Sequence, residues 1–259
     1  MERKAALRRV DYDERQHSVY AQGRALPAAA IAHWMTAFAA HAPSRRPLTV
    51  LDLGSGTGRF TPALAETFGG EAFGVEPSAG MRAQAETSSS HPRVRYLDGR
   101  AEAIPLPDCS CDLVLAFVSF HHVQDRTAGA GEIARVLSPD GRLLFRSTFS
   151  DHMPDPSWHR YFPAAREIEM RIFPSLDEVA ALFAPVGLRP LALDQVETEL
   201  APSLAQYAER LKLRAISTFE HMNEVDIAVG FEALAAAVAA ETEPTPVMAR
   251  EDLLVLGRD

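Results

Sequence analysis

Short apolar runs alternate with segments of helical spacing between residues 48 and 149. The apolar runs, which we expect to be strands, lie at 48–53, 71–77, 93–98, 111–120 and 142–149. The predicted helices lie at 59–68, 78–87 and 128–137, and Ser78 is placed to cap the second of them. Near-continuous apolar strands separated by helices are typical of a parallel sheet covered on both faces. The pattern therefore predicts a doubly wound α/β fold.

The pattern changes beyond about residue 150. Scattered prolines and aromatic residues indicate a lid at 151–174. The predicted elements after the lid are a capped helix at 175–187, a strand at 188–200, a helical segment at roughly 203–240 and a strand at 251–259. The first forty residues are predicted as two helices divided near 23–27. We expect a single domain with a helical cap (1–42), a core (43–150), and the rest of the sheet with helical lid insertions (151–259).

Composition and charge narrow the class of protein. The 259 residues are 47% hydrophobic and 24% charged, as in ordinary globular proteins, and the formal net charge is −9. Nucleic-acid-binding proteins usually carry a basic patch, whereas the net charge of this chain is negative, so we expect no nucleic-acid partner. No apolar stretch approaches the length of a membrane span and no apolar signal core begins the sequence, which predicts a cytoplasmic protein. Cys109 and Cys111 are too close for an ordinary disulfide and too few for a zinc site.

The stretch TVLDLGSGTGRF, residues 49–60, joins the first predicted strand to the first helix through glycines at every second position. A strand, a glycine-rich turn and a helix in succession indicate a bound nucleotide. A P-loop would need a Lys-Ser/Thr pair after the glycines, and none follows. A dinucleotide turn would need a third glycine for close packing of helix and strand, and Arg59 stands there. The turn therefore disfavours both phosphate-binding motifs.

Two acidic residues point to a different nucleotide. Asp52 lies two residues before the first glycine, where its carboxylate would repel a pyrophosphate and attract an ammonium group. Glu76 ends the second predicted strand, where a carboxylate can accept hydrogen bonds from both ribose hydroxyls. S-adenosylmethionine combines an adenosine with an amino-acid tail and a sulfonium. The two carboxylates and the glycine turn together fit this ligand.

Five segments carry a resemblance to a known family. They are VLDLGSGTG (50–58), GVEPSAGM (74–81), GRAEAIPLPDCSCDLV (99–114), SFHHV (119–123) and EIARVLSPDGRLLF (132–145). The chain resembles class I S-adenosylmethionine-dependent methyltransferases of the ubiquinone/menaquinone-biosynthesis-like small-molecule group. The resemblance implies a Rossmann-like, doubly wound seven-stranded sheet. Its last strand, 251–259, would be antiparallel beside the fifth strand, with 188–200 at the edge.

The resemblance also implies roles in cofactor binding for residues that match the family motifs. Backbone groups of Gly54, Ser55 and Gly56 would line the methionine and ribose portion, Asp52 would face the ammonium, and Glu76 would hold the ribose diol. Pro77 and Met81 would pack on the adenine, Ala101 would donate its N–H to the adenine edge beside Glu102, and Phe117 or Ala116 would line the cleft.

One position departs from the family pattern. Members often have an aspartate where this chain has Arg100, and that aspartate accepts from the adenine amino group. Asp98 or Glu102 are the alternatives for this contact, or the contact is absent. The implied cofactor is S-adenosyl-L-methionine, with S-adenosyl-L-homocysteine as its product.

Candidate catalytic residues follow from the chemistry of methyl transfer. The protein aligns the acceptor for in-line displacement, and a hydroxyl acceptor also needs a base, for which histidine is suited. His121 follows the fourth predicted strand, at the edge where ligands bind in parallel sheets; alternatively, it and His122 cap the next helix. Tyr20 is a candidate to close the site from the N-terminal helices. No carboxylates cluster after the fourth strand, so we predict no metal.

The sequence leaves the acceptor open. We expect a small molecule methylated on O, N or C, because the proline-containing motif of base and amide methylases is missing from 116–120. A non-methylating relative that binds S-adenosylmethionine structurally is one alternative, and a nicotinamide-dependent oxidoreductase is a less favoured one. The oligomeric state is not predicted.

Overall fold

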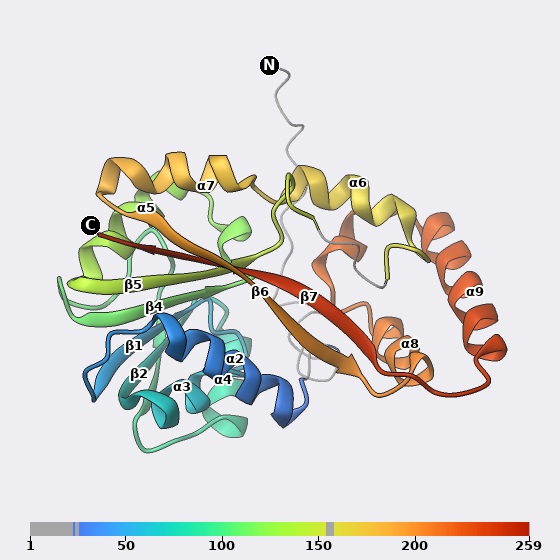
Figure 1. Ribbon diagram of the computed structural model, residues 1–259, viewed down its shortest axis with the longest axis horizontal. Helices are drawn as coiled ribbons and strands as arrows, with labels where there is room; N and C mark the ends of the chain where they lie inside the picture. Colours follow the sequence, from blue (N-terminus) through green and yellow to red (C-terminus); the bar gives the residue numbers. More distant parts are fainter. Residues whose placement is uncertain (1–22, 24–25, 154–157, 259) are drawn as a thin grey trace.

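The computed structural model describes residues 23, 26–153 and 158–258. One seven-stranded sheet runs through it in the order β3-β2-β1-β4-β5-β7-β6 (Figure 1). Its strands are β1 (Leu48–Leu53), β2 (Gly69–Glu76), β3 (Val94–Asp98), β4 (Cys111–Phe117), β5 (Leu137–Ser147), β6 (Arg189–Ala201) and β7 (Val247–Gly257). The five strands from β3 to β5 pair in parallel, and β7 pairs antiparallel with both β5 and β6. The predicted fold class is confirmed, including the position of the last strand.

Helices cover both faces of the sheet (Figure 1). Helices α2 (Ala28–His41) and α3 (Thr61–Phe68) pack on one face, where Trp34, Phe38 and Phe68 join alternate side chains of β1 and β4. Helices α5 (Arg126–Val136) and α7 (Leu176–Phe183) pack on the other. Because successive strand residues point to opposite faces, near-continuous apolar strands supply both cores.

The remaining helical elements connect these layers or extend them. They are α4 (Ala79–Ser88), η2 (Phe120–His122), α6 (Pro163–Ile172), η3 (Ala184–Val186), α8 (Leu204–Lys212), η4 (Ser217–His221) and α9 (Glu224–Ala240). Ser78 caps α4 by accepting the N–H of Met81, as predicted. Gly187 has a left-handed conformation after η3, which ends the predicted helix at 175–187.

The appended helices form an apolar cluster of their own. The α6, α8 and α9 helices lie beyond one end of the core sheet, on the side toward which β6 and β7 extend (Figure 1). Trp158 and Phe162 of the predicted lid are buried there against Phe219 and Phe231. These aromatic side chains therefore form the interior of the appendage and not an exposed lid surface.

Element boundaries differ from the prediction at three strands. β4 ends at Phe117, after which the chain enters η2, and β7 begins at Val247. β5 begins at Leu137, before the predicted start at residue 142, and contains an irregularity where Cys111 pairs with Leu137 and Leu113 with Arg142. The predicted N-terminal helix before residue 23 lies outside the described residues. Among those described, none of the helices has the length and apolar character needed to cross a bilayer.

A buried ion pair connects β5 to β7 at the carboxyl end of the sheet. Arg146 pairs with Glu251, and their side chains are 7% and 17% exposed. Thr198 of β6 also donates its hydroxyl to Glu251, at 3.3 Å. The Glu251 carboxylate therefore bridges three strands.

We expect Glu251→Gln to lower the free energy of unfolding by about 3 kcal/mol, because it removes the negative charge that pairs with the buried guanidinium of Arg146. Urea unfolding followed by circular dichroism measures this loss. The matched control is Glu197→Gln, which removes an exposed ion pair with Arg250 between β6 and β7 and should cost less than about 1 kcal/mol. Equal effects of the two variants would contradict the role of the buried pair.

Candidate cofactor and active site

The carboxyl ends of three neighbouring strands meet at one edge of the sheet. β1 pairs with β2 on one side and β4 on the other, with Asp52 opposite Gly74 and Leu115. The strand order reverses at β1, and such switch points form ligand crevices in open α/β sheets. The structure therefore brings Asp52, Glu76 and Phe117 to one edge.

The glycine turn is held tightly between the ends of β2 and β4. Gly54, Gly56 and Gly58 have φ angles of 72°, 57° and 76°, a region that glycine adopts without strain. The N–H of Gly54 donates to the carbonyl of Val75 at 2.8 Å. A side chain at Gly54 would also overlap Ser119, which follows β4. The alternating glycines thus let the backbone turn where larger residues would not fit.

Glu76 is fixed by two backbone donors. Its Oε2 accepts the N–H of Gly56 at 3.0 Å, and its Oε1 accepts the N–H of Ser78 at 2.9 Å. The residue is 8% exposed. The carboxylate at the end of β2 is therefore held against the glycine turn in one orientation.

Asp52 is a buried carboxylate with a neutral hydrogen-bond donor. The residue is 3% exposed, and Thr61 donates its hydroxyl to Oδ2 at 2.7 Å. Desolvation raises the pKa of Asp52 to about 6, although the Thr61 hydrogen bond and the charge of Arg59 oppose the rise. Among the described residues, no cationic side chain is in ion-pair contact with this carboxylate. A positively charged ligand group fits this position.

Residues predicted near the adenine lie around the ends of β2 and β3. Pro77 is exposed beside Glu76, whereas Met81 is 2% exposed and faces the protein interior from α4. Ala101 is 6% exposed and also packs in the core. Of the three residues, only Pro77 therefore presents an exposed side chain at this edge.

The two acidic alternatives for the adenine contact both have local partners. Glu102 accepts the N–H groups of Gln124 and Asp125 through Oε1, at 2.9 and 3.2 Å, which holds the start of α5. Asp98 forms an ion pair with Arg82 at 2.9 Å. Each carboxylate thus has a structural contact in this protein.

Phe117 belongs to an aromatic cluster on the α2 face. Its ring centroid lies 4.4 Å from that of Phe60 and 5.0 Å from that of Trp34. Two guanidinium groups lie near the same ring, that of Arg146 at 4.8 Å and that of Arg59 at 5.5 Å. Phe117 therefore positions charged side chains at the site edge as well as filling space.

His121 lies in η2, directly after β4. It is half-buried, with its ring centroid 3.8 Å from that of His122 and 4.8 Å from that of Phe173 in the appended segment. The following helix, α5, is capped by the side chain of Asp125, which accepts the N–H of Ala128. The predicted alternative, that the two histidines cap this helix, is therefore wrong. His121 is thus at the junction of the core and the appendage. Tyr20 lies outside the described residues.

A second histidine at this edge was missed by sequence reasoning. Nδ1 of His152, in the loop after β5, lies 2.8 Å from Oδ2 of Asp252. The Asp252 side chain is 1% exposed and the His152 side chain 43% exposed, so a buried carboxylate orients a partly exposed imidazole. The two residues are 100 positions apart, and the pairing of Ser147 with Asp252 brings them together. No local motif could have signalled this pair.

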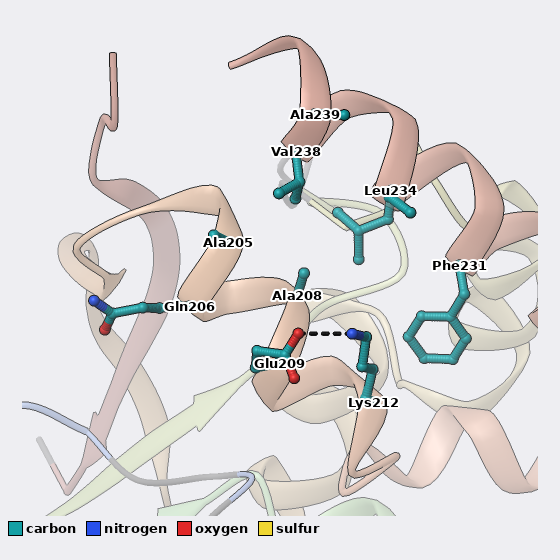
Figure 2. Close-up of a pocket in the computed structure, with 10 residues that line it drawn as sticks. Ala205, Gln206, Ala208, Glu209, Lys212, Phe231, Leu234, Val238 and Ala239 are labelled. Atoms are coloured by element: carbon teal, nitrogen blue, oxygen red, sulfur yellow. Dashed lines mark hydrogen bonds and ion pairs between the residues drawn. The ribbon is translucent and has the colours of Figure 1, made fainter. Parts of the chain in front are cut away.

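A separate hollow lies between α8 and α9 in the appendage (Figure 2). It has a volume of about 350 Å³ and mostly apolar walls, including Phe231 and Leu234, with the Glu209–Lys212 ion pair at one side. None of the predicted cofactor residues lines it. Within the described ranges, no three His, Cys, Asp or Glu side chains are grouped as metal ligands.

Comparisons with known proteins agree with this geometry. Residues 51–145 match the family described as a methyltransferase domain. An uncharacterized methyltransferase of Geobacillus kaustophilus is 30% identical over 147 residues, which cover 53% of this chain and 67% of the relative. A demethylmenaquinone methyltransferase of Bacillus licheniformis is 29% identical over 170 residues, covering 54% and 70%.

Solved structures extend the likeness in fold beyond the matched segment. A putative methyltransferase from an antibiotic biosynthesis pathway of Anabaena variabilis superposes with a TM-score of 0.68 at 23% identity, covering 88% of this chain and 97% of that one. The shared fold thus includes most of the appended region. The match to the methyltransferase domain and the likeness to the Geobacillus relative show that the chain belongs to the class I S-adenosylmethionine-dependent methyltransferase family.

Proposed function

We propose that this enzyme methylates an O, N or C atom of a small-molecule acceptor, with His121 as the group that takes the acceptor's proton. The observation that carries the proposal is the position of His121, which follows β4 at the cofactor edge and contacts Phe173 of the appendage. Both ring nitrogens of His121 are buried in the ligand-free protein, and we propose that an acceptor held between core and appendage contacts one of them. His152, oriented by Asp252 at the same edge, is the second candidate for the base.

The proposed cofactor contacts follow the polar groups of the edge. Glu76, which the N–H groups of Gly56 and Ser78 hold in place, would accept from the ribose hydroxyls, and Asp52 would stabilise the ammonium. Backbone groups of 54–56 would line the tail, with Pro77, Met81, Ala101, Glu102 and Phe117 around them. Bound there, the sulfonium of S-adenosylmethionine supplies an activated methyl group.

We further propose that the division near residues 43 and 150 separates the cofactor-binding core from acceptor-binding additions. The support is the placement of α6, α8 and α9 beyond the end of the core sheet, with their own apolar cluster (Figure 1). Additions that differ between relatives can alter the acceptor while the cofactor edge stays constant.

The proposal is tested by incubating the protein with methyl-labelled S-adenosylmethionine and panels of phenols, carboxylic acids, amines and enolisable carbonyl compounds. Mass spectrometry should find a labelled product together with an equal amount of S-adenosylhomocysteine. Tight cofactor binding without transfer to any acceptor class would favour the non-methylating alternative. Transfer only to a protein or a nucleic acid would overturn the small-molecule assignment.

Glu76→Gln should weaken S-adenosylhomocysteine binding by about 1–3 kcal/mol, because the amide loses the charge that strengthens hydrogen bonds from ribose hydroxyls. Isothermal titration calorimetry measures this change. Glutamine is preferable to alanine because its one amide oxygen can still accept one of the two N–H groups, of Gly56 and Ser78, that Glu76 accepts, whereas alanine would release both. Glu71→Gln, at an exposed position of the same strand, is the control and should leave affinity unchanged. Unchanged affinity in Glu76→Gln would show that this carboxylate is not the ribose ligand.

Asp52→Asn should stabilise the ligand-free protein and weaken cofactor binding. The folded-state pKa of about 6 lies above the ordinary value of 3.8, so the folded state disfavours the ionised form. Because Asp52→Asn removes this unfavourable charge, the variant should gain up to about 3 kcal/mol in unfolding free energy at pH 7.5. The gain should disappear as the pH falls from 6 toward 4, where Asp52 of the wild-type protein becomes protonated. Urea titrations across this range measure it.

Asp98→Asn is the control for this prediction, because the Asp98 side chain is 76% exposed. It should change the unfolding free energy by less than about 1 kcal/mol. A loss of stability in Asp52→Asn at pH 7.5 would contradict the electrostatic account of the buried carboxylate.

His121→Gln should lower kcat for a hydroxyl acceptor by about 10²–10⁴-fold while leaving cofactor affinity within about twofold, because it removes only the proton acceptor. Raising the pH should restore part of the rate by ionising the acceptor itself. The matched control is His122→Gln, which alters the exposed neighbouring ring. Equal rate losses in the two variants would contradict a specific role for His121.

A further inference from the structure

Val118, the residue that follows β4, has a backbone conformation that valine rarely adopts. Its φ angle is 51°, in the left-handed region, which is sterically strained for a side chain branched at Cβ. Among the described residues, only Cys109 and Arg214 share a positive φ outside glycine, and neither is branched at Cβ. Strain of this kind persists only where the surrounding structure holds it, and it is concentrated at functional sites.

Contacts on both sides of Val118 hold this conformation. Its N–H donates to the carbonyl of Arg146 in β5 at 2.9 Å. Ser119 donates its hydroxyl to the carbonyl of Leu53, the last residue of β1, at 2.7 Å. Phe120 is 4% exposed and packs in the core on the α5 face. The turn after β4 is thus tied to β1 and β5, the two strands that flank β4.

This turn directs the chain from the end of β4 toward the glycine turn. An extended residue at position 118 would continue the direction of β4, whereas a left-handed residue changes it. Ser119 then lies so close to Gly54 that a Cβ added to Gly54 would be 2.4 Å from the Ser119 Cβ. The next residue, Phe120, begins η2, which contains His121. The position of His121 relative to the glycine turn therefore depends on the conformation of Val118.

We propose that Ser119 and the left-handed Val118 act together as a positioning element that holds His121 beside the cofactor edge. The inference rests on the proposed role of His121 in methyl transfer. The hydrogen bond from Ser119 to Leu53 opposes the strain at Val118. Loss of this bond lets residue 118 relax toward the extended region that valine prefers, and His121 then moves away from the end of β1.

The strain at Val118 is tested by two variants that both shorten its side chain. Val118→Ala keeps a Cβ, and Val118→Gly removes it. Glycine ordinarily lowers stability relative to alanine because it is freer in the unfolded chain, but it adopts a positive φ without strain. We expect Val118→Gly to unfold about 2–4 °C above Val118→Ala in differential scanning calorimetry. An equal or lower midpoint for the glycine variant would overturn the inference.

The link to His121 is tested by nuclear magnetic resonance of ligand-free protein that contains isotope-labelled histidine. The signal of the His121 ring is identified by its absence from His121→Gln. Because this ring lies 3.8 Å from that of His122 and 4.8 Å from that of Phe173, its chemical shift reports a displacement. In Ser119→Ala the signal should shift, and the protection of the Val118 amide against hydrogen exchange should fall about 10-fold.

A double variant, Val118→Gly with Ser119→Ala, separates positioning from a general loss of structure. Glycine removes the strain that the Ser119 hydroxyl opposes, so the His121 signal should return toward its wild-type position. If Ser119 contributed only to stability, the effects of the two substitutions would add.

The matched control is Ser110→Ala. Ser110 also donates its hydroxyl to a backbone carbonyl, that of Pro107 at 2.6 Å, but it lies before β4, at the opposite end of the strand. Its replacement should leave the His121 signal unchanged.

The outcomes separate this inference from the proposed function, because the measurements need neither cofactor nor acceptor. An unchanged His121 signal in Ser119→Ala, or no recovery in the double variant, would overturn the positioning role alone. Failure of His121→Gln to lower kcat would instead overturn the proposed base. If Ser119→Ala does not fold, the double variant and the comparison of glycine with alanine at position 118 still decide the question.

Discussion

Strand β1 pairs with β2 on one side and β4 on the other, and this pairing sets the geometry of the site. Parallel pairing on both sides aligns three strand ends, so that Asp52, Glu76 and Phe117 reach one edge. The glycine turn exists because the chain must leave β1 at this edge within a few residues, beside Ser119 and under the Glu76 carboxylate. Cofactor chemistry, strand order and turn geometry are therefore consequences of a single arrangement.

The same arrangement has an electrostatic cost. Burial of Asp52 raises its pKa to about 6, which means that the folded protein bears an unfavourable charge near neutral pH. Thr61 and Arg59 reduce this cost without removing it. A cationic ligand group removes more of it, so the instability of the ligand-free edge contributes to ligand affinity. The burial that makes the ionised Asp52 unfavourable in the ligand-free protein also makes this position favourable for a positively charged group.

Polar contacts at this end of the sheet connect β5 to β6 and β7, the strands that extend toward the appended helices (Figure 1). The Glu251 carboxylate joins β5, β7 and β6, and Asp252 orients His152 from the adjacent position of β7. Beyond these contacts, α6, α8 and α9 have an apolar cluster of their own. Such a division allows the appendage to change its surface while the cofactor edge keeps its geometry.

Consecutive residues encode the parts of this protein that can be predicted without coordinates. The alternation of apolar runs predicted the doubly wound sheet, and the glycine turn with Asp52 and Glu76 indicated the cofactor, because strand burial and turn chemistry are local properties. Only the tertiary structure decided the contacts between distant residues. It paired His152 with Asp252, brought Arg59 to Phe117 and gave Glu102 to the start of α5. These contacts depend on strand register and helix packing, which no short stretch of sequence specifies.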